Sequence, residues 1–174
     1  MLTRRRFIAI SAAVAPSMAM ANTGPYVETG IALGAKVTLR LHHPDAPQLA
    51  TLAMTEIRRL EGIFSIYLPD SAISRLNHDG TLSAPPFELL DCLSLAGAVH
   101  AASGGRFDPS IQPLWAAEAM ATGRGYPLAD AERAAVRGLT GWDGVTLSPE
   151  AIALRPGMAL TLNGIAQGYI ADRV

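Results

Sequence analysis

Cysteine is almost missing from this sequence, because Cys92 is the only one among 174 residues. A single thiol cannot close a disulfide within the chain, and no Cys/His spacing indicates a zinc site. Cys92 lies in an apolar stretch with helical spacing, which favours an inert core residue. The sequence therefore excludes an internal disulfide framework.

Charge is also scarce: charged residues make up 17% of the chain, hydrophobic residues 49%, and the formal net charge is -1. Beyond the first six residues no basic cluster stands out, which argues against a nucleic-acid partner. There is no repeat, low-complexity tract or linker. This composition permits a packed core and argues against disorder.

No apolar run is long enough to cross a membrane. The basic Met1–Arg6, the short apolar Phe7–Ala15 and the small-x-small Ala19–Ala21 together have the layout of a cleaved signal peptide over residues 1–21. Arginines before the apolar run favour the twin-arginine route, and an ordinary Sec signal with extra positive charge is the alternative. Both interpretations predict an exported, periplasmic protein.

Hydrophobic periodicity predicts a mixed order of strands and helices, and hence an α+β fold. The alternation at 37–41 indicates a half-buried strand, and the helical spacing at 49–64 indicates an amphipathic helix. Further predicted elements are helices at 71–77, 86–103, 127–136 and from 164 onward, and strands at 145–147, 152–154 and 159–162, with a hairpin turn at 156–157 before the last. Pro109 and Pro113 predict a loop over 107–113.

The last helical pattern continues to Val174 without a capping residue or a polar tail. We therefore expect residues 22–174 to be the N-terminal part of a longer domain.

Three stretches have residues suited to chemistry. In the first, Tyr67 lies on a proline-stiffened loop between Ser65 and Ser71, where an aromatic ring can stack on a flat ligand. The alternative is that Tyr67 fills the core and forms local hydrogen bonds.

The second stretch runs from Ser103 to Leu114. Gly104 and Gly105 allow backbone amides to approach a ligand closely, and Asp108 is held extended by the proline after it. A helix C-cap followed by a tight turn explains the same residues equally well.

The third stretch runs from Leu160 to Asp172, where a predicted strand leads through Gly164 into a helix. Free amides and the helix dipole at such a helix start favour phosphate. Neither a Walker A loop nor a Gly-x-Gly-x-x-Gly fingerprint is present. A plain strand-to-helix turn is the alternative.

In this order and spacing, the three stretches resemble the ApbE-type FAD:protein FMN transferases. That family carries Ser-x-Tyr-x-Pro-x-Ser before Ser-Arg-Leu-Asn, then Gly-Gly-x-Phe-Asp-Pro, then Gly-Ile-Ala-Lys-Gly-Tyr-x-x-Asp after a strand. The resemblance covers about Gly30 to Val174 and implies the N-terminal half of an ApbE-like α+β fold, with the C-terminal half missing. The arginine-rich start and the Asn-Gly-Ile-Ala-Gln-Gly variant are similar to the NosX-type branch, which serves a flavoprotein of nitrous oxide respiration.

The resemblance also implies site residues. The implied cofactor-binding residues are Tyr67, Arg106, Phe107, Asp108, Thr161 and Gln167. Tyr67 would pack on the isoalloxazine ring, the 106–108 loop would hold FAD largely through its backbone, and Gly164 would offer its carbonyl oxygen to Mg²⁺.

Three positions depart from the family pattern. Gln167 stands where a lysine is usual, Thr161 where many members have an aspartate, and Leu33–Ala35 where Met-Gly-Thr is typical. One cation and one carboxylate near the cofactor are therefore lost, which bears on how tightly FAD binds. Gln167 can still hydrogen-bond a phosphate, but without charge assistance.

The implied activity is Mg²⁺-dependent transfer of FMN from FAD to a threonine or serine of a target flavoprotein, such as a NosR-like membrane flavoprotein, with release of AMP. The family's other metal ligands lie in its C-terminal half, so no catalytic residue can be named and these 174 residues alone are expected to be inactive. The alternatives are a periplasmic FAD-binding protein or FAD pyrophosphatase, and a non-catalytic assembly factor.

Overall fold

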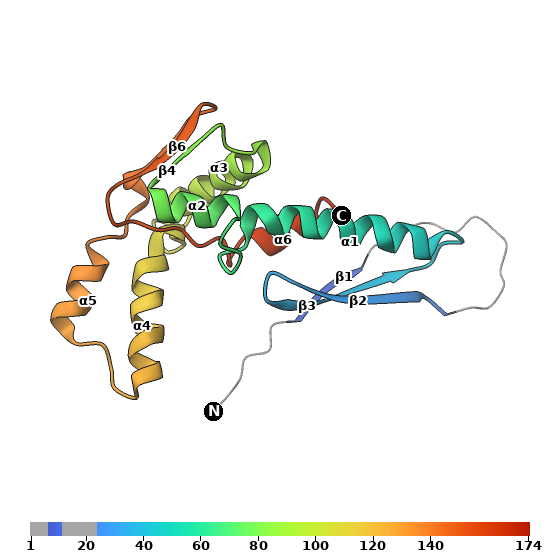
Figure 1. Cartoon of the computed structure of the whole chain (residues 1–174), viewed down its shortest axis with the longest axis horizontal. Coiled ribbons are helices and arrows are strands. Elements are labelled where there is room, and N and C mark those ends of the chain that lie inside the picture. The colour runs from blue at the N-terminus through green and yellow to red at the C-terminus, as the bar shows by residue number, and fades with distance from the viewer. Residues whose placement is uncertain (1–6, 12–23) are drawn as a thin grey trace. The chain divides into compact units, whose positions relative to one another are not determined.

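A computed structural model of the chain describes residues 7–11 and 24–174 (Figure 1). Helices and strands are mixed along the chain, as the α+β prediction requires. Two compact units form: the first contains residues up to Glu61 together with Gln167–Val174, and the second is Gly62–Ala166. The predicted signal peptide lies largely outside the described residues.

The first unit contains a three-stranded sheet in the order β1-β3-β2. Its strands are β1 (Phe7–Ser11), β2 (Tyr26–Ala32) and β3 (Ala35–Leu41). β1 is parallel to β3 and β2 is antiparallel to it. Leu33 and Gly34 join β2 to β3 with φ of 52° and 70°, as a tight hairpin turn of this hand requires.

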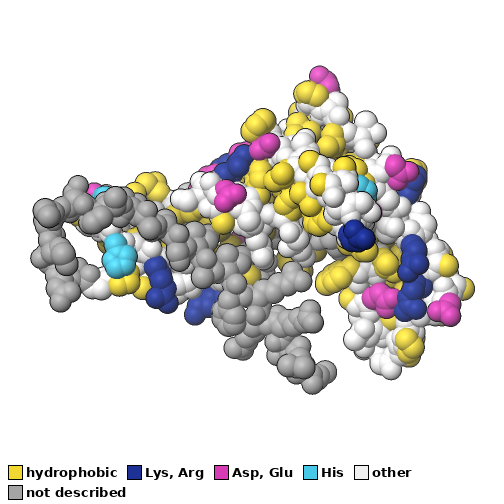
Figure 2. Space-filling model, turned by 180° about the vertical axis from the view of Figure 1, so that it is seen from behind, with side chains coloured by type: hydrophobic (Ala, Val, Ile, Leu, Met, Phe, Trp, Pro, Cys, Tyr) yellow, Lys and Arg dark blue, Asp and Glu magenta, His cyan; other side chains and the backbone are white. Residues whose placement is uncertain are grey.

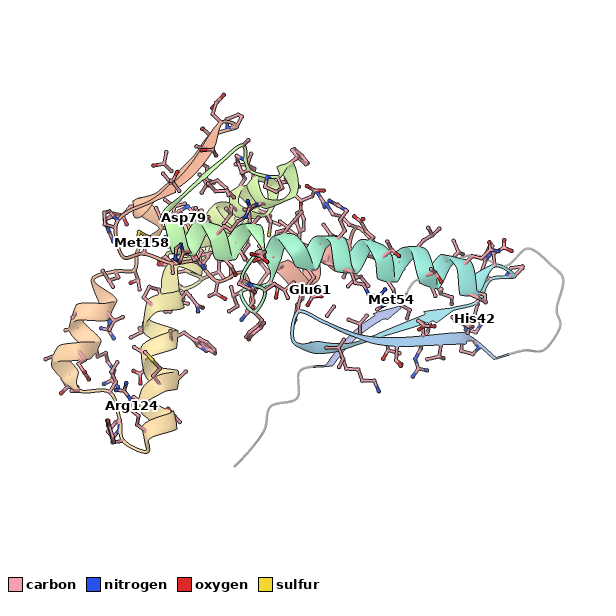
Figure 3. All side chains as sticks on the ribbon, in the orientation of Figure 1. His42, Met54, Glu61, Asp79, Arg124 and Met158 are labelled. Carbon is pink, nitrogen blue, oxygen red and sulfur yellow. The ribbon has the colours of Figure 1, made fainter. Side chains whose placement is uncertain are left out.

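Helix α1 (Ala46–Phe64) packs on the β2–β3 hairpin in the first unit (Figure 3). Met54 of α1 lies against Gly30, where any side chain would collide with it. The Glu61 carboxylate accepts a hydrogen bond from the Leu33 amide at 2.7 Å, which holds the hairpin turn. The predicted strand and the predicted amphipathic helix are both confirmed.

The second unit combines helices with a small antiparallel sheet in the order β4-β6-β5. Its elements are α2 (Ala72–Asp79), β4 (Thr81–Ser83), α3 (Phe87–Ala102), the 3-10 turn η1 (Pro109–Ile111), α4 (Gln112–Arg124), α5 (Asp130–Arg137), the 3-10 turn η2 (Trp142–Gly144), β5 (Val145–Leu147) and β6 (Ala151–Leu154). Helix α6 (Ala166–Ala171) follows. Cys92 is fully buried in α3, as predicted.

The α4–α5 hairpin presents a mixed charged surface, with basic side chains beside acidic ones (Figure 2). Arg133 of α5 contacts Glu118 of α4 at 2.8 Å and Asp130 at 3.4 Å. Salt bridges this exposed contribute little stability.

The prediction of a loop over 107–113 is wrong in its second half. Pro109 opens η1, and Pro113 lies in the first turn of α4. An amide at the start of a helix has no partner within the helix, so proline costs nothing there and its fixed φ suits the helix.

The strand predicted at 159–162 is also wrong, because these residues join no sheet. Pro156–Gly157 does form a turn, with the Met158 amide donating to the Arg155 carbonyl at 3.0 Å, but the chain beyond it pairs with a side chain. The Asn77 amide group bonds both the N–H (2.7 Å) and the C=O (2.8 Å) of Leu160. Asn77 therefore forms the hydrogen bonds with Leu160 that a neighbouring strand would otherwise form.

Across the described residues, no helix is both long and apolar enough to span a membrane.

Candidate functional site

The loop that carries Tyr67 is held by buried serines. The Ser65 carbonyl accepts hydrogen bonds from the hydroxyls of Ser71 (2.6 Å) and Ser74 (3.2 Å), and the Ser65 hydroxyl accepts one from the Tyr67 amide (3.3 Å). The Tyr67 side chain remains 59% exposed, so the alternative that it fills the core is wrong. A fixed backbone with an exposed ring suits stacking on a planar group.

The glycine pair after α3 ends that helix. Gly104 and Gly105 have φ of 61° and 78°, and the Gly105 amide donates to the His100 carbonyl at 2.9 Å. These angles and this bond agree with the helix C-cap that the sequence offered as an alternative, because glycine adopts the left-handed conformation without strain. The pair therefore sets the path of the loop that follows.

Phe107 is held through its backbone on both sides. Its amide donates to the Ser103 hydroxyl at 3.0 Å, and its carbonyl accepts from His100 Nδ1 at 2.8 Å, which places the imidazole proton on Nδ1. The Phe107 N–H is thus committed within the protein. The backbone contact with FAD that was predicted for this loop therefore cannot use the Phe107 amide.

Asp108 is extended, with φ of -135° and ψ of 107°, as the following proline predicts. Its Oδ1 accepts hydrogen bonds from the Ser110 amide (2.9 Å) and hydroxyl (2.6 Å). The fully buried Ser110 hydroxyl in turn accepts from the Gly141 amide at 2.7 Å. This chain of bonds ties the loop to a segment 31 residues away.

A cavity of about 570 Å³ lies beside this loop in the second unit. The predicted residues that line it are Arg106, Phe107, Asp108, Thr161 and Gly164. The Thr161 amide donates to the Pro109 carbonyl at 2.8 Å, which joins the second and third stretches. Two distant parts of the sequence therefore meet at one cavity, and the roles proposed for their residues stay predictions.

Gly164 packs closely on the aromatic ring of the loop. A Cβ at this position would lie 3.1 Å from Phe107 Cε2, so a side chain would press the ring out of place. Gln167 is three residues further along and is the second residue of α6, but it is counted with the first unit.

Some residues that shape the cavity were not indicated by the sequence. Arg137 and Thr140, at and just beyond the end of α5, line it as well. His100 and Ser110 support the loop. Ser110 lies within the second stretch, but its contact with Gly141 depends on residues distant in the chain, and Arg137, Thr140 and His100 lie outside the three stretches.

A larger cavity of about 900 Å³ lies elsewhere in the second unit, with Asp79 and Met158 on its wall (Figure 3). The Gln112 side chain also lines it, and its buried Oε1 has no hydrogen-bond partner in the described part of the chain. This cavity was not predicted from the sequence, although Ser74 and Asn77 of the Ser-Arg-Leu-Asn motif also line it.

A complete Mg²⁺ site is not formed by the described residues. No group of three or more His, Cys, Asp or Glu side chains in residues 7–11 and 24–174 is placed to hold a metal ion. Mg²⁺ requires near-octahedral oxygen ligands and is usually held by one or two carboxylates. Asp108 and Gly164 share a cavity, but one carboxylate and one carbonyl do not meet that requirement.

The chain belongs to the ApbE family, whose sequence model matches residues 33–174. A curated relative, the FAD:protein FMN transferase of Klebsiella pneumoniae (strain 342), is 29% identical over 164 residues, which cover 89% of this chain and 50% of the relative. This finding confirms the family predicted from the motifs.

Solved structures of the same family share the fold. The ApbE protein of Thermotoga maritima matches with a TM-score of 0.75 at 21% identity, over 86% of this chain and 50% of its own. The flavinyl transferase ApbE of Pseudomonas stutzeri matches with a TM-score of 0.71 at 26% identity, over 88% of this chain and 52% of its own. The chain thus spans about half the length of the relatives it matches.

Proposed function

We propose that the protein transfers FMN from FAD to a hydroxyl group of an acceptor protein. Family membership supports the reaction class. The observation that carries the proposal is the cavity at which Arg106, Asp108, Thr161 and Gly164 meet, since these residues come from two of the stretches that resemble the family's motifs. Its volume is in the range typical of a small-molecule site.

In the proposed reaction the oxygen of an acceptor threonine or serine attacks the phosphorus of the FMN half. A new P–O bond forms, and the bond from that phosphorus to the bridging oxygen breaks. AMP leaves with the bridging oxygen, and the hydroxyl proton passes to water or to a base outside the described residues. Mg²⁺ would neutralise phosphate charge in such a reaction, but no step is assigned to it because its site is incomplete here.

The residues of this chain bind and orient the substrate. The exposed Tyr67 ring suits the flat isoalloxazine, and the Arg106 guanidinium suits phosphate. Holding the reacting groups in the right geometry lowers the barrier by removing their freedom of motion. The proposal includes export to the periplasm and an exported or membrane-bound flavoprotein as acceptor, such as a NosR-like protein, supported by the pattern of residues 1–21.

One experiment separates the proposed function from its alternatives. The gene product is incubated with FAD, Mg²⁺ and an acceptor protein that the Klebsiella relative flavinylates, with that relative as the positive control. Covalent flavin on the acceptor is measured by in-gel fluorescence, and free FMN and AMP by chromatography. We expect covalent flavin with one AMP for each FMN transferred.

Free FMN without covalent flavin would identify a pyrophosphatase instead, and FAD binding without any product would identify a binding or assembly protein. A second arm uses the 174 residues alone. We expect this arm to bind FAD but to yield no covalent flavin, because its described residues lack a complete metal site. Covalent flavin in this arm would show that the catalytic site is complete within them.

A further inference from the structure

A second arginine lines the cavity beside the loop of residues 106–108 (the Arg106 loop). Arg137 is the last residue of α5, and its side chain is exposed and lines the cavity together with Arg106. Neither arginine forms a salt bridge with a carboxylate of the described residues. Two arginines and Asp108 leave the cavity wall with a net charge of +1, and Asp108 is already hydrogen-bonded to Ser110.

Two backbone amides of the loop are already hydrogen-bonded within the protein. The Arg106 amide points to the Ser103 carbonyl at 3.5 Å, and the Phe107 amide donates to the Ser103 hydroxyl at 3.0 Å. Both donors are used within the protein. Among the side chains that line the cavity, the guanidinium groups are the strongest donors to an anion.

The position of Arg137 is set by the turn that follows α5. Arg155 donates to the carbonyls of Gly138 (3.4 Å) and Thr140 (2.9 Å). The buried Ser110 hydroxyl accepts from the Gly141 amide at 2.7 Å, which binds the same turn to the Arg106 loop. These contacts hold the end of α5 at the cavity.

We propose that Arg137, together with Arg106, binds the phosphate groups of FAD, an inference that rests on the proposed function. A guanidinium presents paired N–H donors that match the oxygens of a phosphate, and it stays charged at every physiological pH. Gln167 stands where the family pattern has a lysine, so the chain lacks a cation at that position. Arg137 supplies a positive charge at the cavity from a different element.

The test is the binding of FAD, ADP and riboflavin to wild type and to Arg137→Gln, measured by calorimetry at low salt. Loss of one charge-assisted bond predicts a roughly tenfold weaker affinity for FAD and ADP. Riboflavin has no phosphate, and its affinity is expected to stay within about twofold. Added salt is expected to narrow the difference between the two proteins, since exposed charges are screened.

Arg124→Gln is the matched control, because Arg124 is an exposed arginine near the end of α4 on the same hairpin and does not line the cavity (Figure 3). It is expected to bind all three ligands as wild type does. Equal FAD affinity in the wild type and Arg137→Gln would overturn the inference, and so would an equal loss for riboflavin, since that indicates distortion.

The two proposals fail in different ways. If the wild-type protein binds ADP but not FAD, the proposed function is wrong. In that case a weaker affinity of Arg137→Gln for ADP would still support the phosphate site. Wild type that binds neither ligand would overturn both. Arg137→Lys keeps the positive charge but loses the paired N–H donors of the guanidinium. Its affinity for ADP is therefore expected to lie between those of Arg137→Gln and wild type.

Discussion

Individual side chains in this protein divide into those that shape the backbone and those left open to a ligand. Ser65, Ser71 and Ser110 are buried, and their hydroxyls bond backbone groups or a carboxylate. Tyr67 and Arg106 lie on the loops that these serines support, and both remain exposed. The supporting residues remove freedom from the loops, so less entropy is lost when a ligand binds.

Tyr67→Ala tests the ring directly. Stacking on a flat ring stabilises by about 1 kcal/mol beyond the area buried, so FAD affinity should fall roughly tenfold or more. Calorimetry with FAD measures the change. Tyr126→Ala is the control, because Tyr126 is 58% exposed, close to the 59% of Tyr67, but lies outside the three stretches that resemble the family's motifs; neither tyrosine lines a described cavity. Equal affinity in wild type and Tyr67→Ala would remove Tyr67 from the site.

At the scale of elements, the segment after β6 is held by a side chain instead of a neighbouring strand. Asn77, near the end of α2, bonds both backbone groups of Leu160, which is fully buried. Buried backbone groups that lose their partner destabilise a protein. The Asn77 contact therefore links α2 to the stretch that carries Thr161 and Gly164 to the cavity.

Asn77→Ala is expected to lower the free energy of unfolding by about 2–4 kcal/mol, because it leaves one N–H and one C=O of Leu160 without a partner. Urea denaturation followed by circular dichroism measures this loss. His78→Ala, on the same helix and with an 88% exposed side chain, is expected to change stability by less than about 0.5 kcal/mol. Losses of the same size in both variants would show that the Asn77 bonds carry no particular stability.

At the scale of the whole molecule, the cavity of the Arg106 loop lies within the second unit, and the sheet of β1, β2 and β3 lies within the first. Strand β1 falls inside the predicted signal peptide. Cleavage after Ala21 would remove it and leave one edge of β3 without a strand partner among the described residues. An open edge of this kind is available for pairing with another strand.

Export is tested by mass spectrometry of the periplasmic protein, where we expect a chain that begins at Asn22. Joint Arg4→Lys and Arg5→Lys substitution is expected to block export if the route is twin-arginine, since that signal is read by its arginines. Export that persists in this variant would indicate the Sec route. An intact Met1 on periplasmic protein would contradict cleavage.

The sequence by itself determined the elements with a strong periodic signal and the family. Strand β3 and helices α1, α2 and α3 follow from the spacing of their apolar residues and from the Ser71 cap. Family membership follows from short motifs, because the chemistry of a site restricts residue types locally.

Only the tertiary structure decided what depends on contacts between distant residues. Leu160 pairs with Asn77 across 83 positions, and Ser110 bonds Gly141 across 31, and neither contact leaves a periodic trace in the sequence. For the same reason Arg137 could not be assigned to the cavity from its helix alone. Its place there results from how the turn after α5 packs on the Arg106 loop, and packing is a property of the folded chain.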